Sequence, residues 1–165
     1  MTAVRAALVV LLAALLFVAD VSRALAWAAV VAASVAAVLD GVDGWLARRT
    51  GQTTAFGARF DMETDALLIL VLSILVWQWG KAGAWVMAIG LMRYLFVAAG
   101  WVTPWMRGHL SPTRRGKTVA VWQMVTLIVC IGPIVPVWLS TAGAAFSLAL
   151  LAWSFAIDVG RLWRT

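Results

Sequence analysis

Hydrophobic residues along this chain fall into long runs that are separated by short polar segments. Six runs recur, with lengths near the roughly 17 to 25 residues that a helix needs to cross a hydrocarbon layer about 30 Å thick. No alternating strand pattern lies between them, and backbone polar groups in lipid must be satisfied within helices. The pattern predicts an all-α bundle of six transmembrane helices over residues 3–19, 24–39 with a helical continuation toward Arg48, 66–79, 84–102, 119–137 and 142–157.

The composition agrees with a membrane protein. Hydrophobic residues make up 64% of the 165 residues, charged residues make up 12%, and the mean hydropathy is +0.97. The length suits one domain over residues 1–165. The first run carries an early arginine, as a signal peptide does, but the segment "VADVS" is a poor cleavage site. We therefore interpret this run as a helix of the bundle.

The distribution of basic residues predicts the orientation of the bundle, because Lys and Arg concentrate in cytoplasmic loops. With the N-terminus inside, only Arg23 and Lys81 fall outside, and Arg93 lies within the fourth run. Both termini are therefore predicted to be cytoplasmic. The basic residues assigned to the cytoplasmic side are Arg5, Arg48, Arg49, Arg59, Arg107, Arg114, Arg115, Lys117, Arg161 and Arg164.

Charge and cysteine content exclude several classes of function. The net charge of +6 is scattered over short loops, which is typical of contact with anionic headgroups or phosphorylated substrates rather than with nucleic acid. The single cysteine, Cys130, excludes an intrachain disulfide and a thiolate metal cluster. Chemistry in this protein must therefore come from its few other polar residues.

Four aspartates stand at helical spacings around a short turn, "TGQTT". Asp40 and Asp43 are three residues apart, and Asp61 and Asp65 are four apart, so each pair shares one side of a helix. Consecutive helices joined by a short loop run antiparallel, which brings the two pairs together near the cytoplasmic face. We therefore expect four carboxylates to face one cavity.

Such a cluster needs positive charge, because like charges in a site of low dielectric constant disfavour one another's ionisation. Oxygen ligands without His or Cys favour Mg²⁺, Mn²⁺ or Ca²⁺ over zinc, and two divalent ions suit a diphosphate. Nearby small residues allow a nucleotide or pyrophosphate to approach the helix backbone closely. These residues are Gly41, Gly44, Ala47 and Gly57. Isolated acids such as Asp20 and Asp158 are interpreted as solvated instead.

The four paired aspartates and the residues between them resemble the signature of the CDP-alcohol phosphatidyltransferase family, D-x2-D-G-x2-A-R-x8-G-x3-D-x3-D. The matching residues are Asp40, Asp43, Gly44, Ala47, Arg48, Gly57, Asp61 and Asp65. The resemblance implies an integral membrane enzyme, commonly a homodimer, that transfers a phosphatidyl group from a CDP-linked donor to an alcohol and releases CMP. It implies Mg²⁺ or Mn²⁺, in two ions, held by Asp40, Asp43, Asp61 and Asp65, with Asp65 as the base. It also implies a bacterial inner-membrane location and a donor-nucleotide site at Gly44, Ala47, Arg48 and Gly57.

The acceptor is expected near the remaining basic residues. Arg93, Arg114, Arg115 and Lys117 together could bind a phosphate on the acceptor. The stretch "RGKTVAVWQMV" also resembles a helix start in bacterial phosphatidylglycerophosphate synthases, whose acceptor is glycerol 3-phosphate, although Tyr94 and Ala66 depart from that pattern. Two alternatives stay open: another acceptor, such as inositol phosphate, serine or a choline-like amine, and a divalent-cation transporter.

Overall fold

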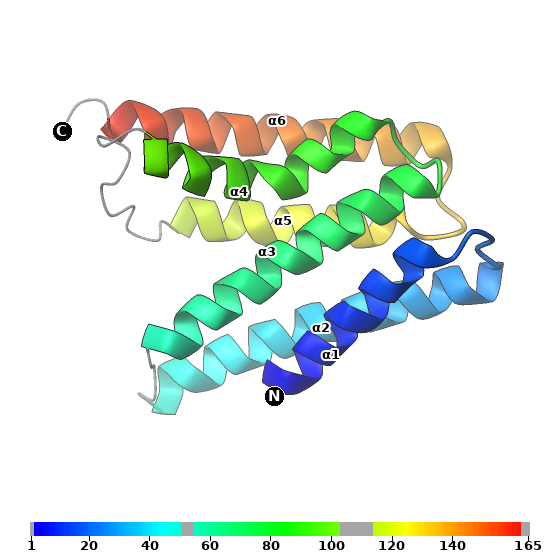
Figure 1. The fold of residues 1–165 in the computed structure, drawn as a ribbon, viewed down its shortest axis with the longest axis horizontal. Coiled ribbons are helices and arrows are strands. Elements are labelled where there is room, and N and C mark those ends of the chain that lie inside the picture. The colour runs from blue at the N-terminus through cyan, green and yellow to red at the C-terminus, as the bar shows by residue number, and fades with distance from the viewer. Residues whose placement is uncertain (1, 51–54, 103–113, 163–165) are drawn as a thin grey trace.

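The described part of the chain is entirely helical. The computed structural model describes residues 2–50, 55–102 and 114–162, and within these ranges it contains six α-helices, two 3-10 helices and no strand. The predicted all-α fold is therefore confirmed for the described residues (Figure 1). The elements are α1 Thr2–Ala14, η1 Leu15–Phe17, α2 Arg23–Thr50, α3 Ala55–Gln78, η2 Ala84–Val86, α4 Met87–Val102, α5 Arg114–Cys130 and α6 Val137–Leu162.

Within the described residues, two helices have the length and hydropathy of a membrane span. They cover Arg23–Gly44 in α2 and Val137–Ile157 in α6, and shorter apolar segments cover Ala3–Phe17 and Ala84–Leu95. Large apolar side chains lie exposed on these helices, among them Val31 and Val38 on α2 at 59% and 64% exposure. An apolar surface of this kind suits contact with lipid chains.

The helix α3 lies at the centre of the packing. It contacts α1 on one side and α4 and α5 on others, while α6 packs mainly against α5. Figure 1 shows α3 crossing the molecule obliquely between the α1–α2 pair and the α4–α5–α6 group. Most of its apolar residues between positions 68 and 76 are almost completely buried and join both groups into one hydrophobic core. These residues are Leu68, Ile69, Val71, Leu72, Leu75 and Val76.

The helix α1 packs against both α2 and α3. The sequence predicted that α2 and α3 run antiparallel and bring their aspartates together, but it did not predict a third helix beside them, and α2 with α3 is not among the main helix contacts of the described residues. Hydropathy and loop length favour neighbours in sequence, but they do not show which third helix fills the space between two diverging ones. The N-terminal helix therefore reaches the region where the aspartates were expected to meet.

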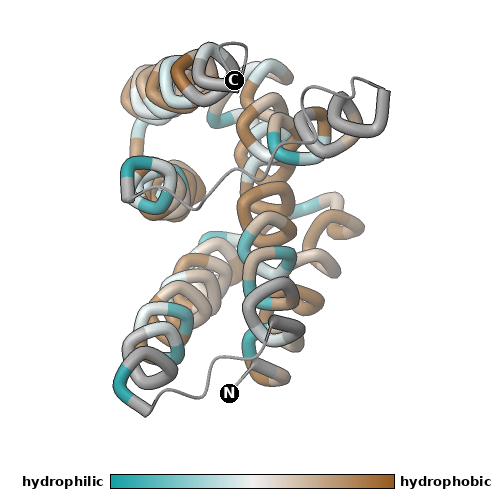
Figure 2. The backbone as a smooth tube through the Cα atoms, turned by 90° about the vertical axis from the view of Figure 1, so that its left-hand side faces the viewer, coloured by the Kyte–Doolittle hydropathy of each residue, from teal (hydrophilic) through white to brown (hydrophobic). Residues whose placement is uncertain are grey.

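Hydrophilic positions gather at one end of the bundle. Figure 2 looks at the left-hand end of Figure 1, and several hydrophilic positions lie at the helix ends that face the viewer. The end of α2 and the start of α3, which carry the predicted acidic residues, belong to this end.

At the opposite end, a lysine joins two turns of the chain. Gly80 has a φ of +65°, a conformation that favours glycine, and it ends the α3 helix just before Lys81. The Lys81 Nζ donates hydrogen bonds to the carbonyl oxygens of Gly132 at 2.9 Å and Val135 at 2.7 Å, in the turn between α5 and α6. Thr141 Oγ1 donates in turn to the Lys81 carbonyl at 3.2 Å. The turn after α3 is thereby attached to the last two helices.

Candidate functional site

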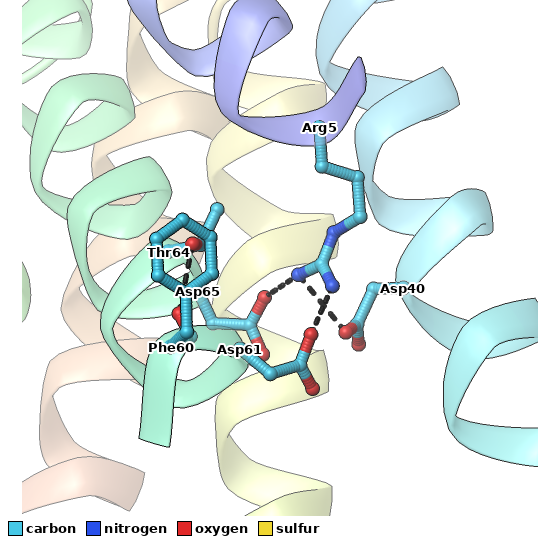
Figure 3. Close-up of polar contacts among 6 residues, drawn as sticks. All are labelled: Arg5, Asp40, Phe60, Asp61, Thr64 and Asp65. Atoms are coloured by element: carbon cyan, nitrogen blue, oxygen red, sulfur yellow. Dashed lines mark hydrogen bonds and ion pairs between the residues drawn. The ribbon is translucent and has the colours of Figure 1, made fainter. Parts of the chain in front are cut away.

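Three aspartates from two helices converge on one arginine from a third helix. Asp40 lies near the C-terminal end of α2, Asp61 and Asp65 lie early in α3, and Arg5 lies in α1 (Figure 3). Asp61 and Asp65 face the same way because residues four apart share one side of a helix. Thr64 uses its own hydroxyl within α3, where it donates to the Phe60 carbonyl at 2.8 Å.

The Arg5 guanidinium contacts all three carboxylates. Its Nη1 donates to Asp61, and its Nη2 donates to Asp65 and also pairs with Asp40 Oδ1 at 2.9 Å. The Arg5 side chain is 2% exposed, whereas the three aspartate side chains are 26% to 38% exposed. The site is therefore buried on the arginine side and open on the carboxylate side.

The carboxylates fit a divalent metal ion. One oxygen from each of Asp40, Asp61 and Asp65 lies within 4.8 Å of the others, so the three can serve as ligands of one ion. All three are hard oxygen donors, which Mg²⁺, Mn²⁺ and Ca²⁺ prefer. The predicted cluster of acids thus appears in the structure with three of its four members.

Asp43, the fourth predicted ligand, does not belong to this group of carboxylates. It is half-buried and lies on α2 one turn closer to the end of the helix than Asp40. Three residues turn an α-helix by about 300°, so its side chain leaves the backbone about 60° around the axis from that of Asp40. The helical spacing places the two aspartates on the same side of α2. It does not determine which of their carboxylates lies close to those of α3.

Burial shapes the charge of the site at Asp65, which immediately precedes the predicted span 66–79. Burial and the negative charge of Asp40 together raise the pKa of the Asp65 carboxyl to about 7, although the positive charge of Arg5 opposes both effects. A fully ionised cluster therefore depends on nearby positive charge. The sequence predicted this requirement, but it did not identify Arg5 as one source of that charge.

Arg5 is the residue of the site that sequence reasoning missed. It was counted only among the basic residues that set the orientation. One signal was available, because a charged residue inside an apolar helix is expected to face the interior and to have a functional partner. The three partners could not be identified without the arrangement of α1 between α2 and α3.

Arg93, a predicted acceptor residue, has an acidic partner on α3. Its Nη2 donates to Glu63 Oε1 at 2.7 Å, and the two side chains are 32% and 60% exposed. Glu63 precedes Asp65 by two residues, and the positive charge of Arg93 also acts on the Asp65 carboxyl. Arg93 thus lies beside the carboxylate cluster, and Glu63 was not singled out from the sequence.

The other predicted basic residues have different surroundings. Arg115 lies over the ring of Trp153, with the guanidinium carbon 5.9 Å from the ring centroid. Lys117 is exposed and lines a hollow of 360 Å³ together with Val121 and Trp122, which are themselves exposed. The structure therefore does not gather Arg115 and Lys117 with Arg93 around one point.

Some predicted positions fall beyond what the structure describes. The side chains of Ala47, Arg48 and Arg114 lie outside the described residues, and so do the turn at 51–54 and the loop at 103–113. Of the predicted donor-site glycines, Gly44 is half-buried near the end of α2, and Gly57 is exposed in the first turn of α3. These two flank the carboxylates on the helices that carry them.

The fold and the carboxylate cluster define a helical membrane protein with a candidate divalent-metal site. The model of the family described as CDP-alcohol phosphatidyltransferase matches residues 1–157. The chain belongs to this family, which agrees with the resemblance found in its aspartate pattern. No solved structure matches the chain.

Three curated relatives share the printed name CDP-diacylglycerol--glycerol-3-phosphate 3-phosphatidyltransferase. The protein of Pseudomonas fluorescens is 32% identical over 155 residues, which cover 83% of this chain and 77% of the relative. The protein of Salmonella typhimurium (strain LT2) is 33% identical over 62% of this chain and 60% of its own length. That of Escherichia coli (strain K12) is 34% identical over 56% of this chain and 54% of its own length.

Proposed function

We propose that this protein transfers a phosphatidyl group from CDP-diacylglycerol to the hydroxyl of glycerol 3-phosphate and releases CMP. The observation that carries the proposal is the convergence of Asp40, Asp61 and Asp65, three residues of the family's pattern, into one group with the spacing of metal ligands. The printed names of the relatives supply the donor and the acceptor. Family membership supports the reaction type.

The proposed metal site uses Mg²⁺ or Mn²⁺, in two ions, with Asp40, Asp43, Asp61 and Asp65 as ligands. Divalent ions at this position would neutralise the donor's diphosphate and the CMP leaving group. The half-exposed carboxylates support this use, because they open toward the side from which a charged headgroup can enter. Asp43 is close enough along α2 to join the set if its side chain turns toward Asp40.

Asp65 is proposed as the base of the reaction. It would take the proton from the acceptor hydroxyl as that oxygen bonds to the phosphorus of the phosphatidyl group and the bond from this phosphorus to CMP breaks. A base works best with a pKa near the operating pH, and the burial of Asp65 acts in that direction. The proximity of Arg93 supports an acceptor that carries a phosphate next to this carboxylate.

The donor nucleotide is proposed to lie against Gly44, Ala47, Arg48 and Gly57. The small side chains of Gly44, Ala47 and Gly57 would let it approach the helix backbones closely. Arg114, Arg115 and Lys117 are also proposed to bind the acceptor. The case for them is weaker than for Arg93, because Arg115 and Lys117 have other neighbours in the structure. The substrate headgroups would enter from the exposed side of the carboxylates while the acyl chains of the donor stay in the bilayer.

The proposed topology has six spans, with both termini and the active site on the cytoplasmic side of a bacterial inner membrane, and the protein works as a homodimer. The excess of Lys and Arg in the loops assigned to that side supports the orientation. Placing the carboxylates at this end also gives cytosolic nucleotide and acceptor direct access to them.

The decisive experiment offers purified protein CDP-diacylglycerol, Mg²⁺ or Mn²⁺, and a panel of acceptors, and identifies the lipid product by mass spectrometry. The panel contains glycerol 3-phosphate, inositol phosphate, serine and choline. We expect phosphatidylglycerol phosphate and CMP only with glycerol 3-phosphate. A lipid product formed only with a different acceptor would overturn glycerol 3-phosphate as the acceptor. If no acceptor in the panel led to CMP release, the proposed transferase activity would be overturned.

A further inference from the structure

The buried Arg5 side chain occupies the place where the carboxylates can bind a cation. Its two terminal nitrogens contact Asp40, Asp61 and Asp65, and the contacts to all three use the Oδ1 atom of the carboxylate (Figure 3). A guanidinium offers several N–H donors in a planar fork, so one arginine can satisfy three acidic partners at once. Arg5 thus supplies an internal positive charge to a site whose acids need one.

We propose that Arg5 is the counter-ion of the carboxylates in the metal-free protein, and that a divalent ion must displace it in order to bind. This inference rests on the proposed metal site. It assigns Arg5 a role in setting the metal affinity of the protein, in addition to any role in helix packing.

Two physical arguments support an exchange rather than joint occupancy. A metal ion coordinates through the same oxygen lone pairs that accept the N–H groups of Arg5, and Mg²⁺ demands close, regular oxygen geometry. A guanidinium and a divalent ion in contact with the same oxygens would also repel each other strongly at short range in a partly buried site. One cation therefore excludes the other from the shared oxygens.

The position of Arg5 makes such an exchange mechanically possible. Arg5 belongs to α1, whereas the carboxylates belong to α2 and α3, so the arginine can withdraw without moving either group of ligands. Its long side chain has several rotatable bonds, while the aspartates are short and held close to their helices. The ligand set can stay in place while the counter-ion changes.

The test measures Mn²⁺ binding to full-length protein in detergent without substrate, using the electron paramagnetic resonance signal of free Mn²⁺. We expect Arg5→Gln to lower the Kd for Mn²⁺ at least tenfold, because the ion no longer competes with the guanidinium. Arg5→Lys, which keeps a charge but loses the fork, is expected to give a smaller decrease of at least threefold. An unchanged or higher Kd in Arg5→Gln would overturn the proposal.

A matched control removes the same charge elsewhere. Arg23 is exposed at the start of α2, at the other end of that helix from Asp40, so Arg23→Gln should leave the Kd within about twofold of the wild-type value. An equal decrease in this variant would show a general effect of net charge and would also overturn the proposal. If Arg5→Gln does not fold, the Arg5→Lys result decides, and an unchanged Kd there refutes the exchange.

Failure of the proposed function can be told apart from failure of the exchange. Asp61→Asn should weaken Mn²⁺ binding if the carboxylates are the metal ligands. Loss of binding in that variant together with an unaltered Kd in Arg5→Gln would retain the metal site and reject the exchange. Absence of saturable Mn²⁺ binding in the wild type and in Arg5→Gln would reject the proposed metal site and the proposed exchange together.

Discussion

Asp61 lies at the meeting point of the site, since its carboxylate contacts Arg5 and stands within ligand distance of two other acids. We expect Asp61→Asn to reduce CMP release at least about 100-fold, because loss of a metal ligand removes several kcal/mol of charge stabilisation. The measurement is turnover of CDP-diacylglycerol by protein that elutes from gel filtration as the wild type does. Asp20→Asn, an exposed acid far from the cluster, is the control and should retain full activity.

Asp65 is expected to separate binding from chemistry. Asp65→Asn should lower turnover by about 10² to 10⁴, as loss of a general base does, while it reduces the affinity for CDP much less. Calorimetric titration of the variant with CDP in the presence of Mn²⁺ gives the affinity, and CMP release gives the turnover. Equal losses in both would assign Asp65 to the metal alone.

At the scale of residues, the sequence pattern predicted the aspartates of the site but not Arg5, the arginine that pairs with them. The spacing of Asp61 and Asp65 fixes a shared helix face, so local geometry was enough to place them together. Arg5 is separated from them by more than fifty residues, and its partners depend on how three helices pack. Nothing local to Arg5 carries that information.

At the scale of elements, the contact between α3 and α4 depends on one glycine. A Cβ atom added at Gly90 would lie 2.5 Å from the Leu70 Cα and 2.8 Å from the Ser73 hydroxyl. The two backbones can therefore approach closely only because this side chain is missing. This contact holds the helix of Arg93 against the helix of Asp65.

Gly90→Ala should destabilise the protein by about 1–3 kcal/mol, because the added methyl group forces two backbones apart. The thermal unfolding midpoint in detergent measures this effect. Gly41→Ala is the matched control, since a Cβ there meets nothing within 4 Å and alanine favours a helix over glycine. A Gly90→Ala midpoint equal to that of Gly41→Ala would show that α3 and α4 do not pack as described.

Helix existence followed from hydropathy, but some helix ends did not. The predicted fifth span ran to residue 137, whereas α5 ends at Cys130 and α6 begins at Val137. The turn between them contains Gly132, Pro133 and Pro136, which interrupt a helix although the segment remains apolar. A reading based on hydropathy continues through such a turn because its side chains are as hydrophobic as those of the helices.

At the scale of the whole molecule, the orientation in the membrane is the property that positions the site. With the carboxylates facing the cytoplasm, Lys117→Cys should react with a membrane-impermeant maleimide only after cells are permeabilised. Asp20→Cys should react in intact cells. Both positions are exposed, and the native Cys130 is buried and should contribute little background. The opposite pattern would place the site on the outer face.

The sequence predicts the class of fold better than it predicts how the helices pack against one another. Composition and the apolar runs indicate a helical membrane protein, because lipid leaves few alternatives for the backbone. The placement of α1 between α2 and α3 depends on side-chain packing among apolar helices, which hydropathy does not distinguish. The shape of the carboxylate site therefore depends on packing that the sequence pattern does not reveal.

The attachment of Lys81 to the last turn has a consequence for the order of assembly. Its carbonyl partners, Gly132 and Val135, are synthesised 51 and 54 residues after it. During biogenesis its ammonium group must therefore stay hydrated or bound to lipid until the α5–α6 hairpin forms and docks. Docking of that hairpin then exchanges these temporary contacts for two fixed ones, so α5 and α6 lock the turn after α3 in place.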